Sequence, residues 1–430
     1  MSPEKRLRWL RLLVLVLCSG SIYKLTNLKD AFYVPMQQFM HLGNTEIGVL
    51  LSVSATVSSV AFVVGGYLAD RLPARVPITL GLVATGLAGI YLSTLPPYAH
   101  MLVLAGFFAF CADCLCWPAL LKAIRATGDE SEQGRMFGFF EGGRGLADTL
   151  VALLALGLFV LLGSGEQGFR AAILLFSAID IAVGVMSYVV LREPAGSAAP
   201  VQTGSDAVGL AGLRQALAMP EVWLVSLNVF MVYIVYCGLI FFVPYLREEY
   251  GMSVGMAGVY GIVNQYALKI LGGPIGGYLA DRRFGSATRF MRVAFLVLVP
   301  AMLLVLVLPQ GSQWVGVGMV ATLAFSLVVF SMRGVFWAPM QEVRVPAAIS
   351  GSAFGIGCLI GYSPGMFAYA GYGAILDHVP GAAGYRLVFG TMLLLSVAGF
   401  GMATVLGRVV ARGPLTSASR TSAPAAPAPP

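Results

Sequence analysis

The sequence predicts an all-α membrane protein with twelve transmembrane helices in two six-helix halves and both termini in the cytoplasm. Three observations carry this prediction: the composition, the distribution of Lys and Arg, and a repeated heptapeptide. Hydrophobic residues make up 58% of the 430 residues and charged residues only 11%, whereas soluble domains are about 25% charged. This composition excludes a soluble globular domain, a disordered chain and a disulfide-stapled secreted domain.

A helix that crosses a bilayer needs about 20 mainly apolar residues. This template finds twelve candidate spans, whose ends are uncertain by about 2–4 residues. In chain order they cover residues 10–34, 46–69, 77–95, 101–124, 134–162, 169–191, 221–245, 254–280, 289–308, 314–338, 347–376 and 385–408.

The distribution of Lys and Arg sets the orientation of the spans, because these residues are retained in cytoplasmic loops. With a cytoplasmic N-terminus, the inside segments hold nineteen Lys and Arg residues, and the outside segments hold three: Arg170, Arg247 and Arg386. The net charge of +7 therefore reports orientation, and we expect no nucleic-acid partner.

The chain also repeats itself. The heptapeptide GGYLADR ends span two at 65–71 and recurs 211 residues later at 276–282, where it ends span eight. We therefore divide the chain into an N-terminal half (1–191), a cytoplasmic linker (192–220), a C-terminal half (221–412) and a disordered tail (413–430).

Ten ionisable residues fall inside the predicted spans, away from their ends. Placing one charge at the bilayer centre costs roughly 2.5–3.5 kcal/mol. The cost of ten unpaired charges would therefore exceed the free energy of unfolding of a typical protein, about 5–15 kcal/mol. They must pair with one another or face a wet cavity, and they are candidates for a functional site. The ten are Lys24, Lys29, Asp30, Asp113, Glu141, Arg144, Asp148, Asp180, Lys269 and Arg333.

Span one carries a polar face. At about 100° per residue, Tyr23, Lys24, Asn27 and Asp30 share one side of a helix, while Lys29 points elsewhere and can snorkel. We interpret this face as a cavity lining, with Tyr23, Lys24 and Asn27 binding substrate and Asp30 coupling transport to protons. The alternative is a ligand-free network in which Lys24 pairs with Asp30.

Span five places Glu141, Arg144 and Asp148 on one face at i, i+3 and i+7. Arg144 is a candidate for substrate binding, and the two carboxylates are candidates for proton coupling. Glu141 and Arg144 also fit an ordinary ion pair on a helix surface, and the sequence leaves both roles open.

Spans eight, four and ten supply the remaining candidates. Gln265 and Lys269 share a face of span eight, and the 211-residue offset aligns Lys269 with Ser58. This cation has no counterpart in the other half, which favours substrate recognition. Arg333 in span ten lies at nearly the depth of Asp113 in span four. We expect Arg333 to bind substrate and Asp113 to couple protons; a bridge between them across the halves is the alternative.

Two six-helix halves with G-x-L-A-D-R after span two and after span eight resemble the major facilitator superfamily, over nearly the whole chain. Shorter strings resemble one subgroup of bacterial inner-membrane transporters in that superfamily: IYKL at 22–25, LKDAFY at 28–33, GFFE at 138–141, GRG at 143–145 and NQY at 264–266. The resemblance implies the major facilitator fold and a multi-pass protein of the bacterial inner membrane.

The resemblance also implies a cytoplasmic lock that stabilises the outward-open state. A carboxylate beside helix termini can accept bonds from unpaired amides, and the neighbouring Arg can hold a second helix. The alternative is ordinary positive-inside charge. Pro73 departs from the family motif, which usually has Gly there, and Asp180 falls in a peripheral span and is expected to be structural. The expected gating residues are Asp70, Arg71, Asp281 and Arg282.

We expect a secondary transporter with its site between the halves, working by alternating access. Lys24, Arg144, Lys269 and Arg333 favour a small organic anion: a sugar acid, a phosphorylated or sulfonated metabolite, or a carboxylate. Proton symport is the expected coupling. The alternatives are anion exchange, proton-coupled export of cationic or drug-like compounds, and a non-transporting membrane sensor. Span five lacks the Gly-Pro-rich pattern of drug exporters, which disfavours export.

The sequence supports no enzymatic activity, cofactor or metal. It contains no nucleotide-binding glycine motif and no nucleophile–base constellation. Cys111, Cys114 and Cys116 gather on span four without a histidine nearby, so we expect no metal site there. The expected partners are the substrate, protons and the lipid bilayer, and the expected state is a monomer.

Overall fold

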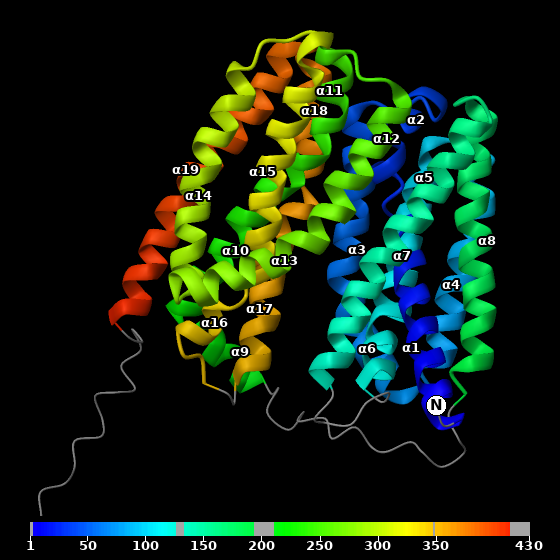
Figure 1. The fold of residues 1–430 in the computed structure, drawn as a ribbon. Helices are drawn as coiled ribbons and strands as arrows, with labels where there is room; N and C mark the ends of the chain where they lie inside the picture. Colours follow the sequence, from blue (N-terminus) through cyan, green and yellow to red (C-terminus); the bar gives the residue numbers. More distant parts are fainter. Residues whose placement is uncertain (1–2, 126–132, 193–209, 347–348, 413–430) are drawn as a thin grey trace, which may run out of the picture.

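The computed structural model describes residues 3–125, 133–192, 210–346 and 349–412, and all regular structure within these ranges is helical. Two helical halves stand side by side, the N-terminal half coloured blue to green and the C-terminal half green to red (Figure 1). We call the end where α1 begins and α19 finishes the terminal face, and the opposite end the distal face.

The N-terminal half consists of helices that alternate in direction between the two faces. Their bounds are α1 (Pro3–Ser21), α2 (Lys29–Phe39), α3 (Asn44–Arg71), α4 (Arg75–Leu92), α5 (Tyr98–Phe110), the π-helical turn η1 (Cys111–Cys116), α6 (Trp117–Arg125), α7 (Gln133–Leu161) and α8 (Glu166–Val190).

The C-terminal half repeats this arrangement with more interruptions. Its elements are α10 (Pro220–Gly238), η4 (Leu239–Phe241), α11 (Phe242–Tyr250), α12 (Val254–Ile262), η5 (Val263–Ala267), α13 (Leu268–Tyr278), η6 (Leu279–Phe284), α14 (Ala287–Val307), η7 (Ser312–Trp314), α15 (Val315–Val335), α16 (Pro339–Glu342), α17 (Ser350–Tyr362), η9 (Ser363–Met366), α18 (Ala368–His378) and α19 (Ala382–Arg412).

Part of the segment between the halves is helical. A short helix, α9 (Leu210–Leu217), occupies part of the expected linker and packs against α10 and α17. The remainder of that linker, 193–209, and the expected tail, 413–430, lie outside the described residues.

Ten helical runs in the described part of the chain are long and apolar enough to cross a membrane. The expected spans one and eight are not among them. Span one is interrupted, because residues 22–28 form turns between α1 and α2. Span eight is helical throughout, but Asn264, Gln265 and Lys269 lower its hydropathy. Both departures fall where the sequence places polar groups at membrane depth.

The two copies of the heptapeptide differ in local structure. The first copy completes α3, which ends in a regular α-helical turn at Arg71. The second copy runs into the π-helical turn η6, which ends at Gly285 in a left-handed conformation (φ 60°). Proline at 73 follows the first copy, whereas glycine at 285 follows the second and can adopt the positive φ at low cost.

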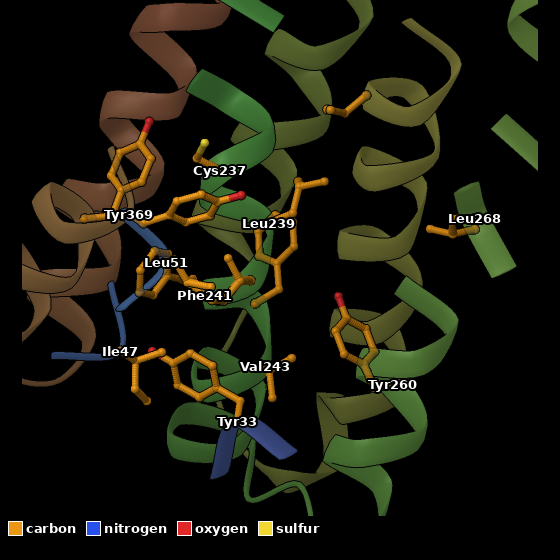
Figure 2. Close-up of a cluster of buried hydrophobic side chains, with 14 of the residues drawn as sticks. Tyr33, Ile47, Leu51, Cys237, Leu239, Phe241, Val243, Tyr260, Leu268 and Tyr369 are labelled. Carbon is orange, nitrogen blue, oxygen red and sulfur yellow. The ribbon is translucent and has the colours of Figure 1, made fainter. Parts of the chain in front are cut away.

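In the part of the chain that the structure describes, the hydrophobic core joins the halves only toward the distal face. One cluster of buried side chains includes residues of both halves, and two smaller clusters toward the terminal face each belong to a single half. Figure 2 shows Tyr33 and Ile47 of the N-terminal half beside Phe241 and Tyr369 of the C-terminal half. The rings of Tyr33 and Phe241 meet edge to face at 6.4 Å.

Glycines bring α3 and α18 into close contact at the distal face. A Cβ on Gly48 would overlap the carbonyl oxygen of Tyr369, and a Cβ on Gly373 would overlap that of Asn44. Toward the middle of the molecule, Gly145 on α7 packs against Ile270 on α13. The halves are therefore tightly joined at the distal face, and their cores separate toward the terminal face.

Candidate functional site

The interruption of span one positions Lys24 between the two halves. Its side chain is 2% exposed, and its Nζ lies 2.6 Å from a carboxylate oxygen of Asp148 on α7. The same ammonium lies 3.7 Å from the ring centroid of Tyr266, which belongs to η5 in the other half. An ion pair and a cation–π contact together hold this cation at the interface.

The prediction for Lys29 is wrong. Lys29 does not point away from the polar face, because its Nζ lies 2.5 Å from Asp30 and 3.3 Å from the side-chain oxygen of Asn27. The helical-wheel argument assumed a continuous helix, but residues 22–28 are turns. The alternative network, in which Lys24 pairs with Asp30, is not formed in this structure: Lys24 pairs with Asp148, and Lys29 pairs with Asp30.

Asp113 lies on the π-helical turn η1, and its carboxylate accepts hydrogen bonds from hydroxyl groups. It accepts a hydrogen bond from Tyr23 at 2.7 Å and another from Ser58. No cation pairs with it in the described part of the chain, so the bridge to Arg333 considered from the sequence is not formed in this structure. A π-helical turn inserts an extra residue into a helix and often occurs at functional sites.

Glu141 and Arg144 form an ion pair on the surface of α7, which is one of the two roles that the sequence allowed. Their side chains meet at 2.8 Å at i,i+3 spacing, and the Glu141 side chain is 50% exposed. The Arg144 guanidinium lies 5.1 Å from the ring of Trp117. Asp148, one turn further on, pairs with Lys24 and not with this arginine.

Arg333 on α15 is stacked on aromatic rings of α10. Its guanidinium lies 3.8 Å from the ring centroid of Tyr236 and 5.5 Å from that of Tyr233. Its Nε is buried and forms no hydrogen bond in the described residues. The ring faces thus hold the cation, and the N–H groups of its planar guanidinium remain available to donate hydrogen bonds to a ligand.

Lys269 on α13 lies among charges from both halves. Asp148, Arg144 and Glu141 of the N-terminal half and Arg333 of the C-terminal half all act on its ammonium. The side chain is exposed and, within the described ranges, forms no hydrogen bond or ion pair. Gln265, about one turn earlier, is buried. The exposed Lys269 side chain therefore lies where charges of both halves act on it.

Asp180 on α8 is fully buried, as expected for a structural residue. Neither of its carboxylate oxygens forms a hydrogen bond in the described part of the chain, although the charge of Lys24 and the hydroxyl of Ser21 lie nearby. It belongs to the interior of the N-terminal half.

Among the gating side chains that the structure describes, Arg71, Asp281 and Arg282 form no ion pair. The Arg71 guanidinium lies 4.0 Å from the ring of Tyr67 on its own helix, and Asp281 and Arg282 are exposed. The Asp70 side chain lies outside the described residues. At this end of α3, Lys122 instead donates to the carbonyl oxygens of Ala69 and Leu72 at the end of the helix, at 2.7 and 3.2 Å. The lock stays a prediction for a different conformation.

The sequence did not identify the aromatic partners of the cations. Tyr266, Trp117 and Tyr236 each lie on a different helix from the charge they contact. The one available signal was the position of Tyr266, directly after Gln265 and one turn before Lys269 on the polar stretch of span eight.

Comparison with known proteins places the chain in one family. The model of the Major Facilitator Superfamily matches residues 31–369. The chain is 43% identical to the inner membrane protein YihN of Escherichia coli K12, over 91% of this chain and 93% of YihN, and the predicted resemblance to that subgroup is confirmed. It is 28% identical to inner membrane protein YqcE of the same organism, over 93% of each.

The fold is also similar to a solved structure. A bacterial homologue of the human lysosomal transporter Spinster, in an inward-facing and unoccupied conformation, superposes with a TM-score of 0.77. The match covers 97% of this chain and 100% of that chain at 16% identity, so it concerns the fold alone.

Proposed function

The chain belongs to the Major Facilitator Superfamily, and we propose that it is a secondary active transporter that carries a small organic anion across the bacterial inner membrane by alternating access. The substrate class is a sugar acid, a phosphorylated or sulfonated metabolite, or a carboxylate. Protons drive it inward by symport.

The balance of charge at the centre of the molecule supports an anionic substrate. The carboxylates of Asp148, Asp30 and Glu141 are each paired with a cation of the N-terminal half. Lys269 and Arg333 in the C-terminal half have no carboxylate partner among the described residues. Two cations without counter-ions attract an oxyanion, which arginine binds bidentately and lysine binds as a point charge.

The packing of the halves supports alternating access. The shared core and the α3–α18 contact close the distal face, while the cores are separate toward the terminal face. The distribution of Lys and Arg favours a cytoplasmic terminal face. On that orientation the separate cores support an inward-open state, and the predicted lock at Asp70, Arg71, Asp281 and Arg282 would form in the outward-open state.

The Lys24–Asp148 pair supplies a route for proton coupling. While Asp148 is ionised it neutralises Lys24, and its negative charge also acts on Lys269. A proton on Asp148 removes that charge and frees Lys24 to face the substrate, so proton binding and anion binding favour each other. Asp113 is the second candidate for the proton, because its described partners are the hydroxyl groups of Tyr23 and Ser58 and not a cation.

Thermal stabilisation of the purified protein tests the substrate class. A ligand present at a hundred times its dissociation constant stabilises the native state by about 2.7 kcal/mol. We expect organic anions to raise the unfolding temperature of the wild type and of the control Arg170→Gln, whose exposed side chain pairs with Glu166 far from the site. Lys269→Ala should lose the effect. Stabilisation by lipophilic cations alone would favour the exporter, and equal stabilisation of Lys269→Ala by anions would contradict the proposed site.

A further inference from the structure

A charged cleft lies at the terminal face of the C-terminal half, away from the central site. It has a volume of about 710 Å³ and is enclosed by the start of α14, the residues after α16 and the last turns of α19. Its charged lining consists of Arg289, Arg292, Arg344, Arg408, Glu221 and Glu342. We call it the arginine cleft.

The four arginines of the cleft have no partner among the described residues. Among the residues that the structure describes, none of their side chains forms a hydrogen bond or an ion pair. Arg289 and Arg292 lie at i and i+3 and therefore on one side of α14. Arg408 reaches the same hollow from α19, so three of the positive charges converge from two helices.

The cleft has two carboxylates against four arginines, and none of the ion pairs in the described residues joins them. Glu342 is engaged by the beginning of α14: it accepts hydrogen bonds from the amides of Ala287 at 2.6 Å and Thr288 at 3.3 Å, and from the hydroxyl of Ser286 at 3.1 Å. Its charge thereby caps the positive end of that helix. Glu221 is fully buried. The cleft keeps an excess of positive charge.

The cleft opens beside a surface that fits lipid chains. Helices α14 and α19 pack along each other at the outer edge of the molecule (Figure 1). Above the cleft they expose apolar side chains, among them Leu296 and Leu303 of α14 and Val397 and Val405 of α19. In a membrane protein such a surface faces the acyl chains of the bilayer.

We propose that the arginine cleft binds the phosphate head group of an anionic phospholipid, whose acyl chains lie along α14 and α19. Arginine binds phosphate through two parallel N–H···O bonds, and basic pockets between transmembrane helices at the cytoplasmic surface bind anionic head groups. A free phosphate would share the head-group contacts but not the apolar surface. The site is independent of the transported substrate.

The test measures lipid binding to the full-length protein in detergent, by native mass spectrometry and by thermal stabilisation. The probes are phosphatidylglycerol, phosphatidylcholine and inorganic phosphate. We expect phosphatidylglycerol to bind and stabilise the wild type, with phosphatidylcholine and millimolar phosphate having little effect. Arg289→Gln/Arg292→Gln should weaken phosphatidylglycerol binding at least about tenfold.

Arg408→Gln and Arg412→Gln form a matched pair on α19. Arg408 lines the cleft, whereas Arg412, one turn further on, is exposed and does not. We expect the first substitution to weaken binding and the second to leave it unchanged, which separates head-group recognition from general surface charge. Equal binding by both variants, equal binding of phosphatidylcholine, or full protection by inorganic phosphate would each overturn the proposal.

Discussion

Asp377 on α18 caps the first turn of α3 in the opposite half. Its carboxylate accepts hydrogen bonds from the amide of Asn44 at 3.1 Å, the side chain of Asn44 at 3.0 Å and the amide of Thr45 at 2.7 Å. A carboxylate at a helix N-terminus satisfies unpaired amides and complements the helix dipole. These bonds join the two halves at the distal face, so separation of the halves there would break them.

Removing this cap should shift the protein toward a state that is open at the distal face. Asp377→Ala loses a cap worth about 1 kcal/mol, a roughly fivefold change in the ratio of the two states. Distances between spin labels at the distal ends of the two halves should lengthen. His378→Ala serves as the control, because His378 bonds within its own helix. Unchanged distances in Asp377→Ala would show that the cap does not hold the closed state.

A methyl group at the contact of α3 and α18 should also open the distal face. In Gly373→Ala the new Cβ overlaps the main chain at Asn44, whereas Gly371→Ala on the same helix meets no atom within 4 Å. Overpacking of this kind costs about 1–3 kcal/mol. A thiol reagent should label Thr45→Cys faster in a cysteine-free Gly373→Ala background than in Gly371→Ala. Similar labelling rates would rule out this contact as a determinant of closure.

The Lys24–Asp148 pair should show strong coupling in a double-mutant cycle. Removing one partner of a buried pair costs about 3–5 kcal/mol, because the other charge is left unpaired. Asp148→Asn and Lys24→Gln should each lower the unfolding temperature more than the double substitution does. Glu166→Gln, which breaks an exposed pair with Arg170, should have little effect. Additive losses at Lys24 and Asp148 would mean that the two residues do not stabilise each other.

The rings around Arg333 should position it for the substrate. Arg333→Lys keeps the charge but loses the planar fork, so we expect at least about tenfold weaker binding of the stabilising anion. Tyr236→Phe keeps the ring face and should bind nearly as the wild type does, whereas Tyr236→Leu should weaken binding. Isothermal titration calorimetry measures all three. Equal dissociation constants for Arg333→Lys and the wild type would remove Arg333 from the site.

Much of the fold was predictable, because the length and hydropathy of a span are local properties. The apolar runs and the repeated heptapeptide predict a polytopic helical protein with two related halves, and family membership confirms this class. The count of twelve spans and the cytoplasmic location of both termini remain predictions. The contact of Lys29 with Asn27 shows why the faces of span one were predicted wrongly. A helical wheel assumes a continuous helix and cannot detect the turns at residues 22–28.

The site was predictable as a set of residues but not as a set of contacts. The cost of burying charge singled out Lys24, Asp148, Lys269 and Arg333 without any coordinates. Their partners depend on how separate helices pack. The cation–π contact of Lys24 with Tyr266 crosses between the halves, and no periodicity along one helix encodes it.

The measurement that tests the account most directly is flux of the stabilising anion into proteoliposomes under an imposed pH gradient. We expect uptake to rise when the outside is acidic and to be lost in Lys269→Ala, while Arg170→Gln transports as the wild type does. Uptake that is independent of the pH gradient but requires an anion on the opposite side would indicate anion exchange and contradict proton symport. Binding without any flux would identify a membrane sensor, and undiminished flux in Lys269→Ala would contradict the cationic site.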